Sequence, residues 1–495
     1  MSTFQISRLI LICFSCIVMS AEVASARTWT DSTGQYKFSA EIVGIENGVA
    51  HLKAANGNIV KVPLAKLAAS DQTYARKWWE AQQKKGTQPA PAAGTATAAS
   101  GKPDKFSWPC FHGADGSNIS PDTGLARSWP EGGPQLLMTV TGIGDGYSSV
   151  SISDGVIYTA GNKDGKTMVF AISSAGKIIW SAPNGPAWTK SYPGTRGTPT
   201  IDGAFLYHKS PSGNLICLNR RDGSKVWEVD VMKTFSGSNI TWGLAESVLI
   251  DGNNLICTPG GSGPAMVALN KQTGKPVWKS KSLGQKPNYA SPVLITQGGL
   301  RILLSFSQFG LFGVNADTGD LLFTHEHKTA HDINATNAIY HEGQIFITSG
   351  YGTTGSQMLK LETRGKMARV SVAWKSKDLD NKHGGIVLYK GYLYGSSDSF
   401  SRGEFVCLDW KTGRKMFSQS VVGKKGCCTL ADGLLYMFGE RKNVALAAAS
   451  PQGLKVTGEF KLPSGGSGIS WAHPVVLDGK LYLRYSDRLY IYNVK

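Results

Sequence analysis

The sequence predicts an all-β protein, in which a small β-barrel precedes an eight-bladed β-propeller of four-stranded antiparallel blades. Three patterns support this prediction: a tight-turn motif that recurs eight times, a glycine placed four residues before an aromatic residue in five repeats, and short alternating apolar runs near the N-terminus. A chain of 495 residues also exceeds the usual size of one compact core. We therefore expect repeats and more than one domain.

The tight turns are spaced by one blade. Each joins two apolar runs, as in "SISDGVIYTA" and "VVLDGKLYLR", and they recur at intervals of 42 to 49 residues. This interval is typical of a four-stranded propeller blade. Asp-Gly pairs favour tight hairpins because the glycine accepts a positive φ. The eight turns begin at or near Asp154, Asp202, Asp251, Gln297, Glu342, Lys390, Asp432 and Asp478.

The glycine and aromatic motif marks the outer half of the repeat. The glycines that precede a tryptophan or phenylalanine by four residues are Gly176, Gly223, Gly274, Gly319 and Gly413. The last repeat stops at "DRLYIYNVK" without an outer strand, whereas "GGPQLLMTV" at 132–140 supplies a lone strand before the first repeat. We expect that strand to close the ring, because closure removes an open sheet edge.

The first 26 residues have the pattern of a secretory signal peptide. Arg8 precedes an apolar run over Leu9–Met19 and small residues over Ala24–Ala26, so we expect cleavage before Arg27. The run is shorter than the roughly 20 residues that a bilayer span needs, which disfavours an uncleaved anchor. We expect an exported mature chain, periplasmic or extracellular, without a transmembrane segment.

The short alternating apolar runs of residues 27–83 predict the small barrel, which a short helix from Ser70 closes. Residues 84–104, rich in Pro, Ala, Gly and Thr, predict a flexible linker to the propeller at 105–495. The first segment resembles the SLA-one homology domain, a Src-homology-like barrel, which implies a module that binds a peptide or protein. The residues that carry this resemblance are Arg27, Trp29, Asp31, Gly34, Phe38, Ala40, Gly57, Val62, Pro63, Leu64, Leu67 and Asp71. Trp29 and Phe38 also suit the core of the barrel.

The net charge of +17 narrows the classes of partner. Outside the cytoplasm, a basic surface attracts acidic proteins or the anionic polymers of a cell envelope, or serves solubility alone. The chain has no Lys/Arg-rich block with interleaved aromatic residues, so we expect no nucleic-acid partner. Six cysteines follow the signal peptide, too few for a disulfide scaffold in so long a chain.

The repeats over residues 106–495 resemble the pyrroloquinoline-quinone-like (PQQ-like) propeller repeat, because they combine Asp-Gly hairpins with versions of A-L-(D/N)-x-x-T-G-x-x-x-W. The resemblance implies one of two functions. Some members are quinoprotein dehydrogenases that hold PQQ and Ca²⁺ at the top of the channel, and others lack catalysis and bind protein partners. The fold alone does not decide between them.

The start of each innermost strand supplies candidate site residues. The residues five positions before each turn, with a one-residue shift in the second repeat, form a polar ring at the upper rim of the channel. The ring comprises Ser149, Thr198, Glu246, Ser291, Asn337, Gly385, Cys427 and His473. Within it, Glu246 and Asn337 offer the oxygen ligands that Ca²⁺ prefers.

A quinoprotein would also need a planar side chain against the quinone and a carboxylate base. Trp242 and Trp471 are the candidates for stacking, and Asp332 and Asp380 are the candidates for the base. Among the rim positions, Glu246 alone is a carboxylate. The scarcity of carboxylates at the rim favours a propeller without catalytic activity.

Two clusters of possible ligands have simpler interpretations. Cys427 and Cys428 are adjacent, and a disulfide between them needs a strained turn because neighbours in a strand point to opposite faces. We expect Cys428 between blades and Cys427 near the channel. The metal-binding candidates His325, His327 and His331 match no specific ligand pattern, so a loop between blades is the simpler interpretation.

We therefore predict an exported, non-catalytic scaffold without a cofactor, in which the propeller binds protein partners and the small barrel binds a peptide. The alternative is a PQQ- and Ca²⁺-dependent quinoprotein dehydrogenase that acts on alcohols or sugars. A carbohydrate-binding surface protein is a third interpretation that fits the aromatic content and the export.

Overall fold

The structure is a computed structural model that describes residues 27–46, 48–54, 58–84, 107–331, 333–351, 354–398 and 403–495. The chain divides into two compact units, residues 1–95 and 96–495. The expected signal peptide and nearly all of the expected linker lie outside the described residues. Among the helices of the described ranges, none has both the length and the hydropathy needed to cross a bilayer.

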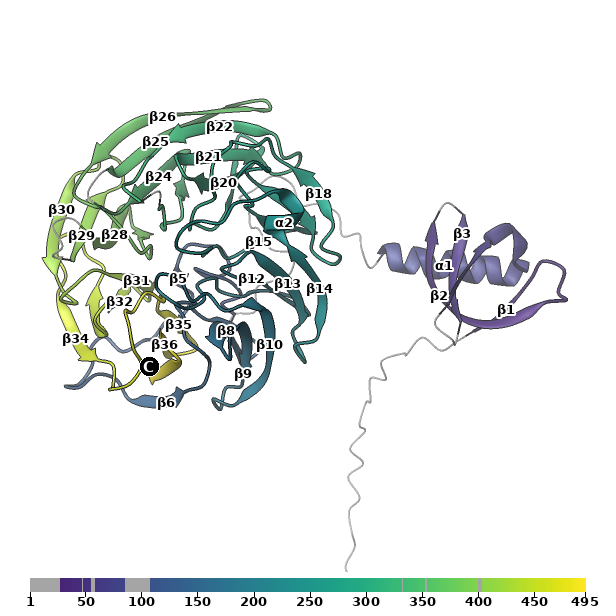
Figure 1. Ribbon diagram of the computed structural model, residues 1–495, viewed down its shortest axis with the longest axis horizontal. Helices are drawn as coiled ribbons and strands as arrows, with labels where there is room; N and C mark the ends of the chain where they lie inside the picture. The colour runs from purple at the N-terminus through teal and green to yellow at the C-terminus, as the bar shows by residue number, and fades with distance from the viewer. Residues whose placement is uncertain are drawn as a thin grey trace, which may run out of the picture. The chain divides into compact units, whose positions relative to one another are not determined.

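The smaller unit is a four-stranded antiparallel sheet with one α-helix (Figure 1). Its elements are β1 (Arg27–Thr30), β2 (Lys37–Glu46), β3 (Val49–Ala54), β4 (Ile59–Pro63), the 3₁₀ helix η1 (Leu64–Lys66) and α1 (Ala69–Lys84). An isolated bridge from Asp31 to Leu67 joins the two ends of the sheet, as a closed barrel requires. The helix begins one residue before the expected Ser70 and runs for 16 residues, longer than the short helix expected.

Trp29 lies at the centre of the small core. Its side chain is fully buried, and its indole N–H donates a hydrogen bond of 2.9 Å to the carbonyl oxygen of Ala40. The carboxylate of Asp71, in the first turn of α1, accepts bonds of 2.7 Å from the Arg27 guanidinium and from the Thr30 N–H. These contacts hold the helix against the first strand, so Trp29 and Asp71 have structural roles.

The larger unit confirms the predicted eight-bladed propeller (Figure 1). Blades 1 to 4 are β7 (Ser151–Ser153), β8 (Val156–Lys163), β9 (Lys166–Ile172) and β10 (Ile178–Pro186); β11 (Thr200–Asp202), β12 (Phe205–Lys209), β13 (Asn214–Asn219) and β14 (Lys225–Asp230); β15 (Leu249–Asp251), β16 (Asn254–Cys257), β17 (Val267–Asn270) and β18 (Pro276–Lys279); β19 (Val293–Gln297), β20 (Leu300–Ser307), β21 (Gly310–Asn315) and β22 (Leu321–Glu326). A short helix, α2 (Val231–Phe235), follows blade 2.

The second half of the ring repeats this pattern. Blades 5 to 8 are β23 (Ile339–His341), β24 (Gln344–Ser349), β25 (Gly355–Arg364) and β26 (Met367–Ser376); β27 (Val387–Tyr389), β28 (Tyr392–Ser397), β29 (Glu404–Asp409) and β30 (Lys415–Ser420); β31 (Gly426–Ala431), β32 (Leu434–Gly439), β33 (Asn443–Ala448) and β34 (Val456–Lys461); β35 (Val475–Leu477), β36 (Lys480–Tyr485), β37 (Arg488–Asn493) and β6 (Leu136–Val140). Consecutive strands pair antiparallel within each blade. Their cores lie between neighbouring blades, where the faces of two sheets meet.

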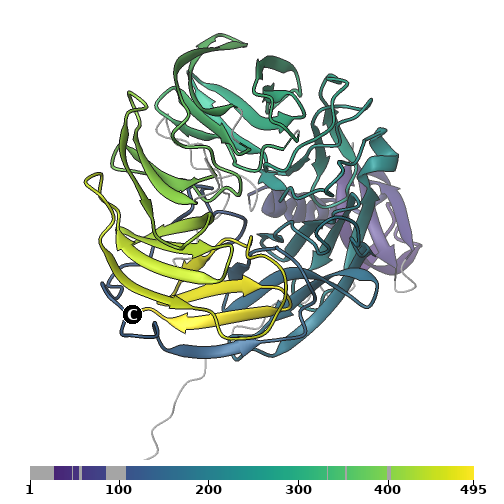
Figure 2. The ribbon, with the colours of Figure 1, turned by 60° about the vertical axis from the view of Figure 1, so that its left-hand side comes forward.

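Ring closure by the N-terminal strand is confirmed. Strand β6 pairs antiparallel with β37 and supplies the outer strand that the last repeat lacks. Figure 2 shows this blue strand along the yellow C-terminal blade. Arg484 of β36 is buried beside the closing blade and donates to the carbonyl oxygens of Gly144 (2.6 Å) and Ile143 (3.3 Å) and to the hydroxyl of Thr159 (3.1 Å). It therefore fastens blade 8 to blade 1.

A segment that the repeats do not predict lies against the innermost strands of the ring. We call residues 108–120 the plug. Trp108 exchanges two backbone hydrogen bonds of 2.8 Å with Ile152 of β7. At its other end, β5 (Ile119–Ser120) pairs in parallel with β31. Because β7 and β31 are innermost strands of blades 1 and 7, the plug occupies the central channel.

Tryptophans of the outer strands dock blades 1, 2, 3 and 5 on the blade that follows each of them. The indole N–H of Trp227 in blade 2 donates to the carbonyl oxygen of Lys271 in blade 3 at 2.9 Å. A Cβ added to Gly274, also in blade 3, would lie 2.9 Å from the Trp227 ring, so this glycine packs flat on the indole. The same bond is donated by Trp180, Trp278 and Trp374. The glycine and aromatic motif thus acts between blades.

Gly319→Ala tests this docking. Gly319 has φ +81°, and a Cβ there would lie 2.7 Å from the ring of Trp278. The matched control is Gly155→Ala, at φ +71° with no atom within 4 Å. Both alanines meet the left-handed penalty of about 1–2 kcal/mol, and overpacking adds about 1–3 kcal/mol at Gly319 only. Equal losses of unfolding free energy in urea would contradict the docking role.

Candidate functional site

A belt of hydrogen bonds joins the innermost strands at one rim of the channel. The backbone N–H of Ser149 donates to Thr198 Oγ1 (3.1 Å), and that of Thr198 donates to Ser247 Oγ (2.9 Å). The pattern continues from Ser247 to Ser291 Oγ and from Ser291 to Asn337 Oδ1, both at 2.9 Å. The predicted ring residues Ser149, Thr198, Ser291 and Asn337 therefore meet around the channel, where they tie five blades together.

The structure corrects the ring in blade 3, where Ser247 takes the position predicted for Glu246. The reason is the turn. In blade 1 the pair Ser153–Val156 leaves Asp154 as the first turn residue, whereas in blade 3 Asp251 still pairs with Asn254. The turn therefore starts one residue later, and the residue five positions before it is Ser247.

Glu246 consequently points away from the channel and into the contact between blades 2 and 3. Its carboxylate lies 3.4 Å from the ammonium of Lys209 and accepts hydrogen bonds from the backbone N–H and hydroxyl of Thr258. Lys209 also donates to the Thr258 carbonyl oxygen at 3.1 Å. Burial raises the pKa of Glu246, and Lys209 and Thr258 offset part of that rise. The charge of Glu246 is therefore balanced within the protein.

This arrangement does not fit a calcium site. The carboxylate oxygens of Glu246 face Lys209 and Thr258, and Asn337 Oδ1 already accepts the Ser291 N–H. An ammonium beside the carboxylate opposes a second cation there. No group of three His, Cys, Asp or Glu side chains placed to hold a metal ion is found in the described part of the chain.

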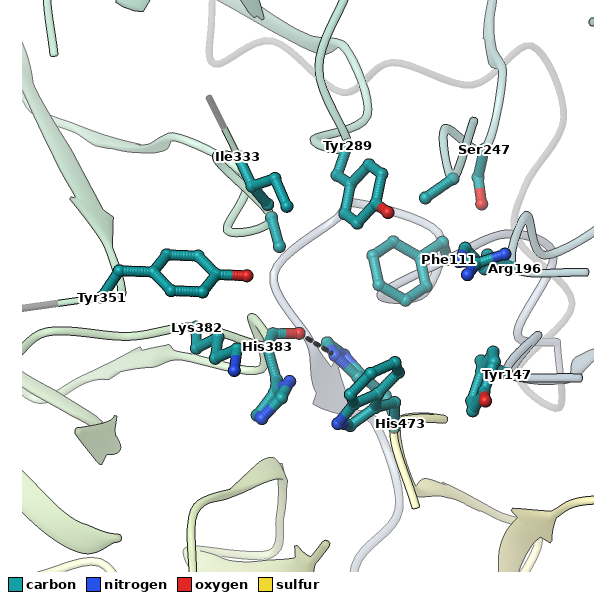
Figure 3. Close-up of a pocket in the computed structure, with 13 residues that line it drawn as sticks. Phe111, Tyr147, Arg196, Ser247, Tyr289, Ile333, Tyr351, Lys382, His383 and His473 are labelled. Atoms are coloured by element: carbon teal, nitrogen blue, oxygen red, sulfur yellow. Dashed lines mark hydrogen bonds between the residues drawn. The ribbon is translucent and has the colours of Figure 1, made fainter. Parts of the chain in front are cut away.

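A pocket opens above the belt, at what we call the mouth of the channel (Figure 3). Its cavity is about 120 Å³. Seven blades contribute the residue two positions before their ring residue, so these side chains project one pleat higher, on the same face of the strand end. They are Tyr147, Arg196, Ala245, Tyr289, Ala335, His383 and Trp471; Phe111, Ser247, Ile333, Tyr351, Lys382 and His473 complete the lining.

The plug forms the floor of the mouth. Phe111 stacks on His112 with ring centroids 3.9 Å apart, and His112 Nε2 lies 2.8 Å from His473 Nδ1. His473 Nε2 in turn lies 2.8 Å from the His383 carbonyl oxygen. Burial lowers the pKa of His112 and brings that of His473 to about 4, so both rings are neutral at pH 7. The mouth is therefore closed below by neutral, stacked rings.

The candidates for stacking and for the catalytic base lie in different places. Trp471 lines the mouth, and its indole N–H donates to Glu440 at 2.8 Å. Trp242 packs beside Tyr192, with ring centroids 6.1 Å apart, and is not in the lining. Asp380 is buried outside the lining, with its backbone N–H bonded to Ser397 Oγ. Asp332 lies outside the described residues.

The three candidate metal-binding histidines do not converge. His325 Nε2 lies 2.7 Å from Gln357 Oε1, and His327 Nε2 lies 2.9 Å from Ser349 Oγ. His331 packs edge-on against Tyr351, with centroids 4.7 Å apart. Their different partners do not favour a metal site. The expected loop between blades begins only after Glu326, because His325 lies in the outer strand β22.

The adjacent cysteines are free thiols that lie on opposite faces of β31. Cys428 packs in the core between blades 6 and 7, as expected. Cys427 does not face the channel: it packs in the core between blades 7 and 8, with Sγ 3.6 Å from the Ala472 carbonyl oxygen. Burial raises the pKa of Cys428 to about 12, so this thiol is unreactive at neutral pH.

Comparisons with known proteins agree with the fold described above. A family model described as outer membrane protein assembly factor BamB, of the PQQ_2 type, matches residues 165–419, just over half of the chain. The chain belongs to this family. The model of SLA1 homology domain 1 matches residues 19–83. Both parts of the resemblance read from the sequence are thereby confirmed.

Solved structures share the fold of this BamB-family chain. BamB from Moraxella catarrhalis is 16% identical, over 73% of this chain and 98% of that one, with a TM-score of 0.52. Quinohemoprotein alcohol dehydrogenase from Comamonas testosteroni is 11% identical, over 78% and 80%, with a TM-score of 0.56. At such identities the likeness concerns the fold alone.

Two curated relatives match shorter parts of the chain. Quinoprotein alcohol dehydrogenase PedH of Pseudomonas putida is 27% identical over 150 residues, 28% of this chain and 25% of that protein. Actin cytoskeleton-regulatory complex protein sla1 of Schizosaccharomyces pombe is 39% identical over 57 residues, 12% of this chain and 4% of that protein. The chain spans a quarter or less of the length of these two relatives.

The mouth residues that sequence reasoning missed are mainly Arg196, Lys382, Tyr147, Tyr289 and Tyr351. Arg196, Tyr147 and Tyr289 could have been found by moving two residues back from each ring position, because alternate residues of a strand share a face. Lys382 and Tyr351 lie on loops outside the repeat pattern. The sequence carries no signal for their approach to the mouth.

Lys209→Met tests the buried ion pair. The variant leaves the Glu246 carboxylate without its counter-charge, and we expect the unfolding free energy in urea to fall by about 3–5 kcal/mol. The double variant Lys209→Met/Glu246→Gln should lose clearly less than the single variant, because it buries no unpaired charge. A double variant as unstable as the sum of the two single variants would contradict the pairing.

Three buried histidines predict a pH dependence of stability. Burial lowers the pKa values of His208, His327 and His473 to about 4, below the unfolded value near 6.5. The unfolded state then binds more protons between pH 6.5 and 4, so stability should fall as the pH drops through this window. We expect urea midpoints to show this decline and His208→Asn to flatten it. An unchanged slope in that variant would contradict the assignment.

Proposed function

We propose that this chain is an exported, non-catalytic binding protein whose propeller mouth receives one partner and whose small barrel receives another. The observation that carries the proposal is the lining of the mouth, in which the described residues include two cations, Arg196 and Lys382, and no carboxylate. Export rests on the signal-peptide pattern of residues 1–26. Protein partners accord with the BamB family, which is described as an outer membrane protein assembly factor.

The quinoprotein alternative asks for chemistry that the described residues of the mouth do not offer. It requires a carboxylate base next to the substrate and oxygen ligands for Ca²⁺. Glu246 is turned away from the mouth and paired with Lys209. Because the donor set does not fit the metal, no reaction step follows from it.

The small barrel supports the second half of the proposal. Its matched family includes sla1 of fission yeast, which is described as part of an actin cytoskeleton-regulatory complex. Tyr36 and the strand residues Ile59 and Val60 are between 45% and 71% exposed. Ile59 and Val60 are neighbours on β4, an edge strand of the sheet, and an exposed apolar sheet edge is suited to a short peptide.

Calorimetric titration of the mature protein with PQQ, with and without Ca²⁺, tests the absence of quinoprotein function. We expect Ca²⁺ to leave the PQQ affinity unchanged, and we expect no dye reduction with alcohols or sugars. Glu246→Gln is the matched variant, checked for folding by its melting temperature. A Ca²⁺-dependent affinity that Glu246→Gln abolishes, or steady dye reduction, would overturn the proposal.

A further inference from the structure

The two faces of the propeller balance their positive charges in different ways. Each innermost strand runs from its ring residue to a tight turn, so the tight turns lie on the face opposite the mouth. On that face, aspartates at the tight turns pair with cations of the next blade. The pairs are Asp154 with Arg220 (2.5 Å), Asp202 with Lys271 (2.5 Å) and Asp251 with Arg301. The charges of these cations are balanced within the protein.

Cations around the mouth rest on aromatic side chains instead. We call the loops and strand ends that surround the mouth the mouth face. Six of its cations lie between 4.8 and 5.7 Å from the centroid of an aromatic ring: Lys190 with Trp188, Arg196 with Tyr147, Lys279 with Phe235, Lys328 with Phe309, Lys382 with Tyr351 and Lys442 with Tyr485. An aromatic ring attracts a cation through its quadrupole but carries no net charge. These contacts therefore hold the cations in place without balancing their charge.

Carboxylates balance few of the six cations. Lys328 alone among them forms an ion pair within the described residues, with Glu326 at 3.4 Å. Both side chains of that pair are more than half exposed, so water screens the attraction between them. The mouth face therefore keeps unpaired positive charge.

The surroundings of Lys382 show the effect of this charge. Two carboxylates, those of Asp398 and Glu440, act on the Lys382 ammonium and raise its pKa, but Asp398 is itself paired with Lys425 at 2.6 Å. Burial and the charge of Lys425 outweigh the two carboxylates and lower the pKa of Lys382. An additional carboxylate is therefore favoured at this part of the mouth face.

The centre of the mouth face is aromatic and hollow. Tyr192 is 45% exposed, and its ring centroid lies 4.8 Å from that of Trp471 and 6.1 Å from that of Trp242. The mouth adds the rings of Tyr147 and Tyr289, which Figure 3 shows around the pocket. An aromatic centre inside a polar rim is typical of protein–protein interfaces. A hollow suits a protruding segment of a protein, whereas the flat surface of a bilayer would not fill it.

The six cations are spread around the ring of blades. Lys190 and Arg196 lie between blades 1 and 2, Lys279 in blade 3, Lys328 after blade 4, Lys382 between blades 5 and 6, and Lys442 in blade 7. Figure 3 shows Arg196 and Lys382 on opposite sides of the mouth. A ligand that contacts several of these cations must cover the mouth face, and a small anion is not wide enough to do so.

We propose that the mouth face docks an acidic protein, whose carboxylates pair with the cations around the mouth while a protruding segment meets the aromatic centre. The inference rests on the proposed function, because it names the chemistry of the partner that the mouth receives. Cations that already rest on aromatic rings lose little side-chain freedom on binding. The opposite charges also speed the encounter of the two proteins.

Calorimetric titration of the mature protein with an acidic peptide tests this inference. The probe is a peptide of about 20 residues that alternates Glu with Ser, which is long enough to reach several of the cations. Its matched control peptide carries Gln in place of Glu. We expect the Glu peptide alone to bind, and we expect its binding to disappear between about 50 and about 500 mM NaCl, because salt screens exposed charges.

The variant Lys190→Gln/Lys279→Gln/Lys442→Gln removes three cations of the mouth face that lie outside the pocket lining. We expect this variant to bind the Glu peptide about tenfold more weakly, because each lost pair contributes modestly to the affinity. Its melting temperature checks that it folds.

The matched control is Lys177→Gln/Lys275→Gln/Lys390→Gln, which lowers the net charge by the same amount. These three lysines are exposed and lie at turns of the opposite face. Lys390 rests 5.1 Å from the ring centroid of Tyr389, much as the mouth-face lysines rest on their rings. The control variant should keep the affinity for the Glu peptide within about twofold.

Three results of these titrations would overturn the inference: equal losses in the two triple variants, equal binding of the Glu and Gln peptides, or no binding of the Glu peptide. Binding to phosphatidylglycerol vesicles that the mouth-face variant loses would also overturn it, since the face would then meet a membrane. None of these results involves PQQ affinity or dye reduction, so the inference can fail while the proposed function stands.

Discussion

The propeller depends on one contact repeated between blades: a tryptophan that donates its indole N–H to the next blade while a glycine of that blade lies flat on its ring. The contact joins a polar bond to a large buried area, so each blade is oriented as well as held. Where phenylalanine replaces tryptophan, as at Phe323 and Phe417, the N–H donor is lost. At the outer strands, packing then takes the place of this bond between blades 4 and 5 and between blades 6 and 7.

The mouth inherits its rigidity from this frame. The belt that passes from Ser149 to Asn337 fixes the ends of five inner strands, and the pocket residues lie only two positions beyond it. Arg196 is further restrained by carbonyl oxygens of its own loop. Side chains held in this way keep their spacing before a ligand arrives, which lowers the entropic cost of binding.

Much of the architecture could be predicted from the sequence because it repeats. The turn spacing gave eight blades, and the unpaired strand at 132–140 gave the closure seen at β6. The site was harder to predict, because the ring position in each blade depends on the residue at which the turn begins. Asp251 is still paired within its strand, so the turn of blade 3 starts one residue later and Ser247 takes the ring position in place of Glu246. The plug and the approach of Lys382 come from segments without a repeat, where no periodicity exists to be read.

The plug has a consequence for how the protein matures. Asn118 bonds to Thr429, 311 residues further along the chain, so the floor of the mouth assembles only from the two far ends of the propeller. Contacts of such sequence separation form late and slowly in folding. A nascent or truncated chain can stack its middle blades, yet it has no finished mouth. The ability to bind a partner is therefore acquired in the last step of folding, so incomplete molecules do not bind that partner.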